Sequence, residues 1–448
     1  MKKRKKALQI VQRLRESGFK ALLVGGCVRD MVMGEEPKDY DIATDATPQE
    51  VMKLFRHAID VGAQFGVVRI LDGDDQFEVA TFRTDGLYRD GRHPEHVTFS
   101  SEWDDVMRRD FTINGLLYDP IADGLIDYVG GQDDIRRRII RTIGNPYRRF
   151  EEDKLRLMRG VRFSSRYQYT IEAQTFQAMK ALAEKITQVS AERIRDELLI
   201  MLTQGRADKS LKLLHEVGLL RQILPEVAAM DGVQQPPEFH PEGDVLTHTI
   251  MMAGMMANPS PELAMAVLLH DVGKPATFVV KERIRFDGHD KVGAVMAEQI
   301  CRRLRFSNKS TEQIVELVED HLRFMHVQRM RSSRLKRFLR KEGFEEHLEL
   351  HRLDCLASHG KLDSYLFCVE KLQELKEEIK PQKLISGDDL IEMGFIPGPF
   401  FKKILTYVED AQLDGKVSTR EEALCLVGEK FGTCNTKLKA REPYDPFC

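Results

Sequence analysis

The chain lacks the features of disulfide-bonded, secreted or membrane-spanning proteins. Its 448 residues include seven cysteines, none of them in a CxxC pair, so we expect reduced thiols and a cytoplasmic protein. The longest apolar runs, such as 263–269, are far shorter than the roughly 20 residues that a membrane helix requires. The basic N-terminus leads into the polar segment 12–16 rather than an apolar stretch, so we expect neither a signal peptide nor a membrane partner.

A charge excess of either sign is also missing. The sequence has 68 Lys and Arg against 71 Asp and Glu, and its net charge of −3 taken alone argues against a nucleic-acid partner. The charge is uneven, however: window 136–166 holds ten Arg and one Lys against three acidic residues, a net +8 that leaves −11 elsewhere. A local basic stripe indicates a polyanion partner, and Arg suits bidentate phosphate contacts. The alternative is a solvated helical surface with pairs four residues apart.

The order of expected strands and helices along the sequence predicts an α+β chain. Its length predicts two to four domains. An N-terminal sheet domain should end near residue 125, and an all-helical remainder should follow it. Breaks are expected near 232–243, which contains Pro236, Pro237 and Pro241, and near 380–381. Strands are expected at 21–24, 39–43, 66–71 and 77–82, the last two joined by the turn 72–75. Helices are expected at 5–17, 28–33, 151–164, 173–185, 190–203 and 206–216.

Two aspartates form the first candidate site. Asp39 and Asp41 flank Tyr40 on an expected strand, so alternation puts both carboxylates on one face. Such a pair can hold Mg²⁺, activate a 3′-hydroxyl and stabilise leaving pyrophosphate, although an isolated pair is more often a surface turn. Upstream, Gly25–Gly26 would let backbone N–H groups approach phosphates, and Arg29 could add a charged contact. A plain glycine turn explains the glycines but not the whole combination.

These motifs resemble those of class II tRNA nucleotidyltransferases, which include CCA-adding enzymes and bacterial poly(A) polymerases. The matching segments are Leu23-Val-Gly-Gly-Cys-Val-Arg-Asp30, Lys38-Asp-Tyr-Asp-Ile-Ala-Thr44, Arg108-Arg-Asp-Phe-Thr-Ile-Asn114, Glu152–Phe163 and Ala191–Glu197. The resemblance implies a polymerase-beta-like nucleotidyltransferase head. It further implies that Gly26, Arg29 and Arg109 contact the triphosphate and ribose.

The same resemblance implies that Asp153 and Arg156 select the incoming base. Cytosine and adenine each present an amino donor beside a ring-nitrogen acceptor, which a carboxylate and a guanidinium match. Guanine and uracil present the opposite order and would leave buried groups unpaired. Arg159 and Arg162 continue the helical spacing toward phosphate, and Glu152 should orient an arginine. The alternative is an internal ladder of salt bridges.

Two further segments bear on specificity. Segment 81–94 is rich in glycine and charge and looks like the family's flexible loop, which argues against an enzyme that adds only C. Glu78 is either a third metal carboxylate or an ordinary exposed strand residue. Segment 385–400 looks like the family's tail element, a helix–turn–helix that could touch the tRNA elbow, and a plain helical hairpin fits equally well.

A second metal constellation lies in the C-terminal half. His270 and Asp271 end the buried apolar run 263–269, where two polar groups are costly unless they bind something. The pattern resembles HD-domain phosphohydrolases. The core ligands would be His248, His270, Asp271 and Asp354, with His289 and His321 serving a second metal or the substrate. The domain could instead be a structural or RNA-positioning module.

Together these features predict an enzyme that builds the CCA end at the tRNA 3′ end from CTP and ATP. Its cofactors would be Mg²⁺ and a second divalent transition metal in the HD domain. The expected parts are a head at 1–135, a neck at 136–232, an HD domain at 240–378 and a tail at 379–448. The alternatives are an A-adding enzyme or poly(A) polymerase on the same scaffold, and an HD phosphohydrolase with an RNA-binding N-terminal half. Oligomeric state, the identity of the HD metal and the HD substrate stay open.

Overall fold

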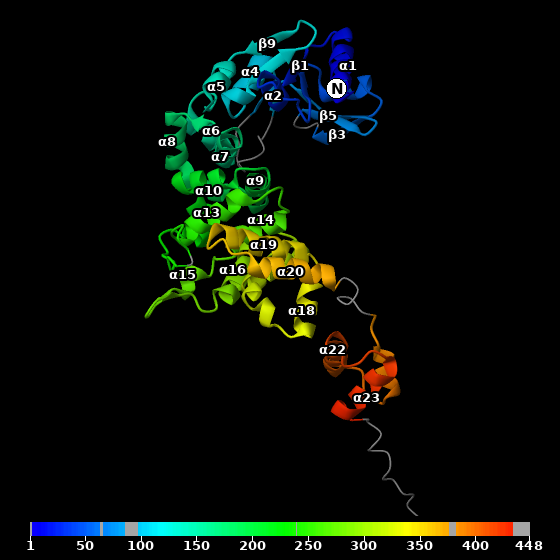
Figure 1. Ribbon diagram of the computed structural model, residues 1–448. Coiled ribbons are helices and arrows are strands. Elements are labelled where there is room, and N and C mark those ends of the chain that lie inside the picture. The colour runs from blue at the N-terminus through cyan, green and yellow to red at the C-terminus, as the bar shows by residue number, and fades with distance from the viewer. Residues whose placement is uncertain (1, 63–65, 86–96, 239, 376–381, 433–448) are drawn as a thin grey trace, which may run out of the picture. The chain divides into compact units, whose positions relative to one another are not determined.

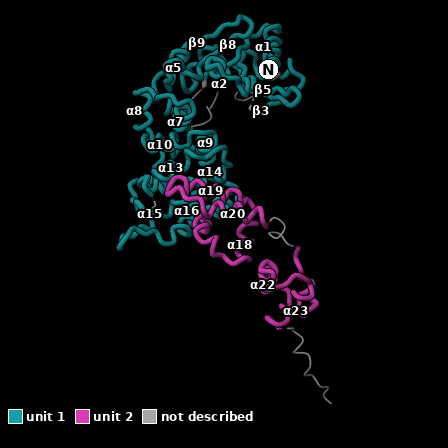
Figure 2. The backbone as a smooth tube through the Cα atoms, viewed as in Figure 1, with its two compact units in different colours: residues 1–318 teal, residues 319–448 magenta. Residues whose placement is uncertain are grey.

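The structure, a computed structural model, describes residues 2–62, 66–85, 97–238, 240–375 and 382–432 (Figure 1). The chain forms two compact units, residues 1–318 and 319–448 (Figure 2). Of the sequence predictions, the loop 81–94 lies largely outside the described residues, as does the break at 380–381. None of the described helices combines the length and apolar character needed to cross a bilayer.

The first unit begins with a mixed seven-stranded sheet. Its strand order is β3 (Ala58–Gly62), β4 (Val67–Asp72), β5 (Asp75–Thr81), β2 (Asp41–Thr44), β1 (Ala21–Val24), β8 (Leu116–Asp119) and β9 (Gly124–Asp127). Only the β2–β5 pair is parallel, with Ile42 opposite Val79. The expected turn 72–75 joins β4 and β5. The β2–β5 pairing brings the start of β2 beside Glu78 of β5.

Short helices and a two-stranded ribbon complete this sheet domain. They are α1 (Lys2–Glu16), α2 (Gly26–Val32), α3 (Pro48–Leu54), α4 (Glu102–Met107), η2 (Thr112–Asn114), α5 (Gly131–Arg137) and the ribbon β6 (Arg83–Asp85) with β7 (Val97–Phe99). Leu22, Ala43 and Leu117 of the sheet pack with Phe82 and with Val106 of α4. This cluster packs α4 against the central strands β1 and β2, which carry two of the motifs.

The rest of the first unit is mostly helical. It contains α6 (Pro146–Glu152), α7 (Arg156–Tyr167), α8 (Ala173–Leu182), η3 (Ala183–Gln188), α9 (Ala191–Thr203), α10 (Ala207–Glu216), α11 (Leu219–Ile223), α12 (Pro225–Ala228), α13 (Val245–Met255), α14 (Pro261–Leu269), α15 (Lys274–Thr277), α16 (His289–Arg303) and most of α17 (Asn308–Asp320). Two small ribbons interrupt it, β10 (Ile139–Ile140) with β11 (Thr170–Ile171) and β12 (Val279–Val280) with β13 (Ile284–Arg285). Helix α7 packs on α9 and α10, and α10 packs on α13.

The second unit is helical throughout its described residues. It contains η4 (His321–Arg329), α18 (Ser332–Leu339), α19 (Phe344–Ala357), α20 (Asp363–Glu374), α21 (Gly387–Glu392), α22 (Pro399–Leu413) and α23 (Arg420–Phe431). Phe324, Phe338 and Phe344 form one apolar cluster. Leu390 and Ile404 belong to a second cluster that joins α21 to α22 and α23. The helix–turn–helix expected within 385–400 therefore corresponds to α21, the turn that follows it and the first residues of α22.

Two predicted boundaries were wrong in an instructive way. Strand β2 begins at Asp41 rather than at residue 39, so Asp39 lies in the bend before the strand. The helix expected at 151–164 is two helices, because Asp153 leaves the helical conformation and its carboxylate accepts the N–H of Leu155 at 3.0 Å. The break re-aims Asp153 relative to Arg156.

Candidate active site

The largest group of predicted site residues surrounds one cavity of about 500 Å³ in the first unit. All seven predicted nucleotide-binding residues line it, together with Asp41. The complete lining is Gly25, Gly26, Arg29, Asp41, Arg83, Arg108, Arg109, Asp110, Asn114, Asp153, Leu155, Arg156, Arg159, Arg162, Phe163, Arg166 and Arg193. Nine arginines against three aspartates make this a cavity for a highly charged anion.

The carboxylates at the start of β2 differ in their surroundings. Asp39 is exposed and lies outside the cavity lining, with its Oδ1 2.6 Å from Nζ of Lys3. Burial, reinforced by the nearby carboxylates of Glu78 and Asp39, raises the pKa of Asp41 to about 6. Carboxylates that repel one another in this way fit a divalent cation, which relieves the repulsion through oxygen ligands. The placement favours Glu78 as a carboxylate beside the site, although it also bonds Arg69 at 3.0 Å.

A tight turn brings Arg109 against the backbone. Gly25 has φ +71°, and a Cβ there would lie 2.7 Å from Nη1 of Arg109. The Arg109 guanidinium is held by the buried Asp105 carboxylate, with Nη2 2.8 Å from Oδ2. Burial disfavours the charged form of Asp105, but Arg109 and Arg108 outweigh it and keep its pKa below the usual value. The glycine therefore creates the space in which Arg109 reaches the cavity.

The other predicted phosphate arginines are held by partners from distant segments. Arg29 is buried and donates to Asn114 Oδ1 at 2.6 Å, while its guanidinium stacks 4.8 Å from the Tyr167 ring centre. Arg159 lies 2.6 Å from Asp110 Oδ2, and Arg162 bonds Glu197. Each arginine thus has the fixed position expected of a preorganised phosphate site and also the partner expected of an internal ladder.

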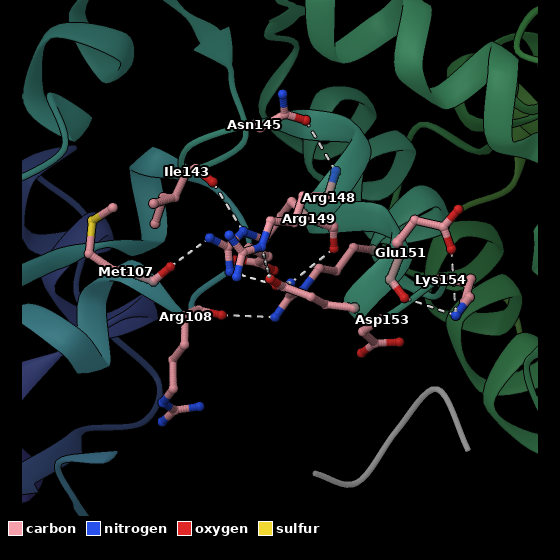
Figure 3. Close-up of polar contacts among 12 residues, drawn as sticks. Met107, Arg108, Ile143, Asn145, Arg148, Arg149, Glu151, Asp153 and Lys154 are labelled. Atoms are coloured by element: carbon pink, nitrogen blue, oxygen red, sulfur yellow. Dashed lines mark hydrogen bonds and ion pairs between the residues drawn. The ribbon is translucent and has the colours of Figure 1, made fainter. Parts of the chain in front are cut away.

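The predicted base-selecting pair lies at the break between α6 and α7. Arg156 donates through Nη1 to Glu152 Oε2 at 2.9 Å and to the Arg149 carbonyl at 3.0 Å, and through Nη2 to the Arg108 carbonyl at 2.8 Å. Figure 3 shows this network around Arg108 and Arg149, with Asp153 beside it. The expectation that Glu152 orients an arginine is confirmed. Since a guanidinium has five N–H groups and these bonds use three, donors remain for a base.

Arg193 is the main cavity residue whose role was not predicted. Its Nη2 lies 2.9 Å from Oδ2 of Asp153, so it holds the carboxylate that the sequence assigns to base selection. Arg83 and Arg166 also line the cavity. Arg193 stands inside the segment 191–197, which the sequence matched to the family without assigning a role to any of its residues. The charge of segment 191–197 was a signal of its role in the sequence. The sequence could not show, however, that the partner of Arg193 is Asp153, forty residues away.

A second group of side chains converges on Asp271. The Nε2 atoms of His270 and His289 lie 3.2 Å and 3.4 Å from its two oxygens, and the ligand atoms of His248, His270 and Asp271 all lie within 4.8 Å of one another. The opposite ring nitrogens of His270 and His289 face the carbonyl oxygens of Val267 and Phe286. These carbonyls fix Nδ1 as the protonated nitrogen, which leaves Nε2 of a neutral imidazole for a metal ion. We call His248, His270, His289 and Asp271 the His–Asp centre.

Two residues complete this centre in ways that the sequence did not reveal. The Glu242 side chain is buried, and its carboxylate bonds Nδ1 of His248 at 2.6 Å and Nδ1 of His240 at 2.9 Å. Lys274 places Nζ 2.7 Å from Asp271 Oδ2 and donates to Gln235. Together, His270 and Lys274 outweigh burial and hold the pKa of Asp271 well below its usual value. The ionised carboxylate and the oriented imidazoles fit a divalent metal.

The remaining predicted HD residues lie in the second unit. Asp354 is a half-buried residue of α19, and His321 is the buried first residue of η4. Their membership of the metal site stays a prediction.

Three family models match the chain. They are the Poly A polymerase head domain over residues 21–141, the probable RNA and SrmB-binding site of polymerase A over 168–230, and the HD domain over 245–353. These matches confirm the resemblance and the fold class, a sheet-containing nucleotidyltransferase head followed by a mostly helical remainder.

Several proteins of known name are similar over nearly the whole chain. The CCA-adding enzyme of Geobacillus sp. (strain WCH70) is 32% identical over 94% of this chain and 95% of its own length. That of Streptococcus pneumoniae (strain R6) is 31% identical over the same shares. That of Lactobacillus helveticus is 44% identical, but its match spans 44% of this chain and 49% of the relative.

Solved structures agree with the sequence relatives. A crystal structure of the Bacillus stearothermophilus CCA-adding enzyme in complex with CTP has a TM-score of 0.74 and 28% identity, covering 95% of this chain and 97% of that one. With head, RNA-binding and HD matches in order, and relatives above 30% identity that are covered over 95% of their length, the chain is a member of the family of CCA-adding enzymes.

Proposed function

We propose that this protein adds C, C and A in turn to the 3′ end of tRNA, using CTP and ATP and releasing pyrophosphate at each step. One observation carries the proposal: the cavity joins a carboxylate at Asp41, a set of fixed arginines and the pair Asp153–Arg156. The similar enzyme from Bacillus stearothermophilus was solved with CTP, and that from Thermotoga maritima with tRNA. We also propose that the reaction takes place in the cytoplasm.

Base selection follows from the donors and acceptors in the cavity. Asp153 accepts from the amino group of cytosine or adenine, and Arg156 donates to the adjacent ring nitrogen. Uracil and guanine would oppose a carbonyl oxygen to the Asp153 carboxylate, which costs about 1–3 kcal/mol for each unpaired group. Arg193 and Glu152 hold the two selecting side chains, so the protein itself takes the place of a template base.

The remaining residues position the triphosphate and the primer. Arg109, Arg159 and Arg162 orient the phosphates through charge-assisted hydrogen bonds. Gly26, which has no side chain, lets the phosphates approach the backbone. Asp39 and Asp41 would hold Mg²⁺, which when bound supplies charge compensation at the 3′-hydroxyl and the pyrophosphate.

The test offers CTP and ATP to four tRNAs that lack three, two, one or none of the terminal nucleotides. We expect the first three to be completed and the fourth to be left unchanged. Extension of only the third would identify an A-adding enzyme, and extension without a stop would identify a poly(A) polymerase. Asp41→Asn should abolish addition while tRNA binding persists, and addition that survives this change contradicts the assigned metal ligand.

A second function is favoured by the His–Asp centre. We propose that it binds a divalent transition metal and supports a phosphohydrolase side activity, with Asp354 as a further ligand. The supporting observation is the orientation of the imidazoles by outer acceptors. Metal analysis should find less bound transition metal in His270→Ala/Asp271→Ala than in the unaltered protein. Equal metal content would assign these residues a purely structural role.

The division into four parts is also a proposal. Head 1–135, neck 136–232, HD domain 240–378 and tail 379–448 agree in order with the three family matches. Limited proteolysis should cut first near 232–243 and 380–381, and cuts inside 173–203 would contradict these boundaries.

A further inference from the structure

The second unit carries a basic segment outside both sites described above. Residues 321–341 contain six arginines, two lysines and no acidic residue. The segment comprises η4 and α18 and ends just after α18. It carries the same net charge as the window 136–166 in fewer residues, although His321 is the one residue in it to which the sequence assigned a role.

The segment surrounds a cavity of about 810 Å³. The lining residues are Arg323, His326, Arg329, Met330, Arg331, Arg334, Arg337, Phe338 and Lys341. None of these described side chains carries a carboxylate or an amide. The cavity therefore offers many donors for phosphate oxygens and little that could read a base.

The cationic groups differ in how they are held. On one side, Arg337 bonds Glu409 at 2.7 Å, and Arg323 lies 3.0 Å from Asp320, so these guanidinium groups are fixed. Arg329 and Arg334 are exposed and form no ion pair with any residue in the described ranges. Fixed groups shape the cavity, while the two exposed arginines leave their charge available to a ligand.

We propose that this cavity binds the phosphodiester backbone of RNA, independently of sequence. The inference rests on the proposed function in naming tRNA as the RNA. Five arginines around one hollow suit several successive phosphates, because a guanidinium can bind two phosphate oxygens at once. A single nucleotide would leave most of these cations without a partner. The cavity thus adds affinity for the body of the RNA, separate from the site that reads the incoming base.

The test compares two double variants of the full chain. Arg329→Gln/Arg334→Gln removes two charges from the cavity. The control, Arg221→Gln/Arg302→Gln, removes two exposed charges from α11 and α16 and so keeps net charge equal. tRNA binding is measured by fluorescence anisotropy across a salt series, and thermal unfolding checks that both variants fold.

We expect the cavity variant to bind tRNA roughly tenfold more weakly near 0.1 M salt, with a salt slope reduced by about two. The control should keep the affinity and slope of the unaltered protein. At saturating tRNA, the cavity variant should add CMP with the kcat of the unaltered protein. When the tRNA concentration is varied, its KM for tRNA should be raised.

Equal tRNA affinities of the two variants would overturn the proposal. So would a cavity variant that loses binding to inorganic phosphate but binds tRNA as tightly as the unaltered protein does. The outcome is separable from the proposed function. If the unaltered protein adds no nucleotide to tRNA, the proposed function fails, whereas the anisotropy comparison still decides whether this cavity binds RNA.

Discussion

At the scale of single residues, base selection depends on how firmly Asp153 is held. Arg193→Ala removes the guanidinium that lies 2.9 Å from its carboxylate, so Asp153 gains rotational freedom. We expect preference for CTP over UTP to fall about tenfold, because a mobile carboxylate discriminates poorly between amino and carbonyl groups. The measurement is kcat/KM for CTP and UTP on a tRNA that lacks two nucleotides.

A matched control lies on the same helix. Arg195→Ala removes an arginine that does not line the cavity; its partners are Asp196, at 2.7 Å, the Arg305 carbonyl and the Phe306 ring. It should leave the preference intact. If both variants keep full preference, Arg193 has no role in selection.

Residue types were easier to predict than residue pairs. The family motif assigned Asp153 and Arg156 to the base, and helical spacing added Arg159 toward phosphate. The structure places all three around one cavity, although Asp153 lies at the break between α6 and α7 and not on the helix of the two arginines. The partners could not be predicted, because Asp110, Glu197 and the other acceptors come from distant segments. A pattern in one helix shows which charges face one way, but tertiary packing decides which charge neutralises each.

At the scale of elements, the turn between β1 and α2 is a precise test of the phosphate site. Gly25→Ala would place a Cβ 2.7 Å from Arg109 Nη1 at φ +71°, which costs roughly 1–2 kcal/mol in backbone strain and displaces the guanidinium. We expect KM for CTP and ATP to rise about tenfold, as steady-state kinetics would measure.

Gly34→Ala separates strain from displacement. Gly34 has φ +78°, but a Cβ there meets no atom within 4 Å. This variant should lose similar stability in thermal unfolding and keep its KM values. Equal changes of KM in the two variants would mean that Arg109 does not contact the nucleotide.

The loop before α13 provides a second prediction for a single element. Glu242→Gln keeps the size of the side chain but removes the charge that orients His248. Removal of a carboxylate that hydrogen-bonds a metal-binding histidine typically weakens metal binding by about 10–100-fold. We expect that loss in titrations with Co²⁺ or Ni²⁺, whereas Glu282→Gln, at an exposed site, should bind as the unaltered protein does. Unchanged affinity in Glu242→Gln would refute the orienting role.

Element boundaries show where local patterns were insufficient. The four predicted strands are present, but β3, β8 and β9 of the same sheet were not predicted. The break at Asp153 was not predicted either, because a side-chain acceptor there competes with the helical hydrogen bond. Likewise Glu242 gave no signal, since one acidic residue in a proline-rich loop resembles any solvated loop residue. Local propensity could not reveal that this carboxylate is buried against two histidines.

At the scale of the whole molecule, the net charge of −3 conceals opposing regions. The arginine-lined cavity lies in the first unit and a second basic cavity in the other. Composition therefore gave the wrong indication about nucleic acid, and resolving charge along the sequence recovered only the first region. The second escaped notice because the sequence assigned a role only to His321 within 321–341. The charge of this segment became meaningful only when the fold placed it around a cavity.

The two proposed metal sites should respond to different ions. Asp39 and Asp41 offer hard oxygen ligands, whereas the His–Asp centre offers three imidazoles, which favour transition metals. After chelation, Mg²⁺ alone should restore nucleotide addition, and Ni²⁺ should bind tightly only at the imidazoles. Asp271→Asn should therefore lose Ni²⁺ binding in calorimetry and still add CMP and AMP at the normal rate. If addition required a transition metal, or fell with Asp271→Asn, the two sites would not be chemically independent, and the His–Asp centre would have to contribute to polymerisation itself.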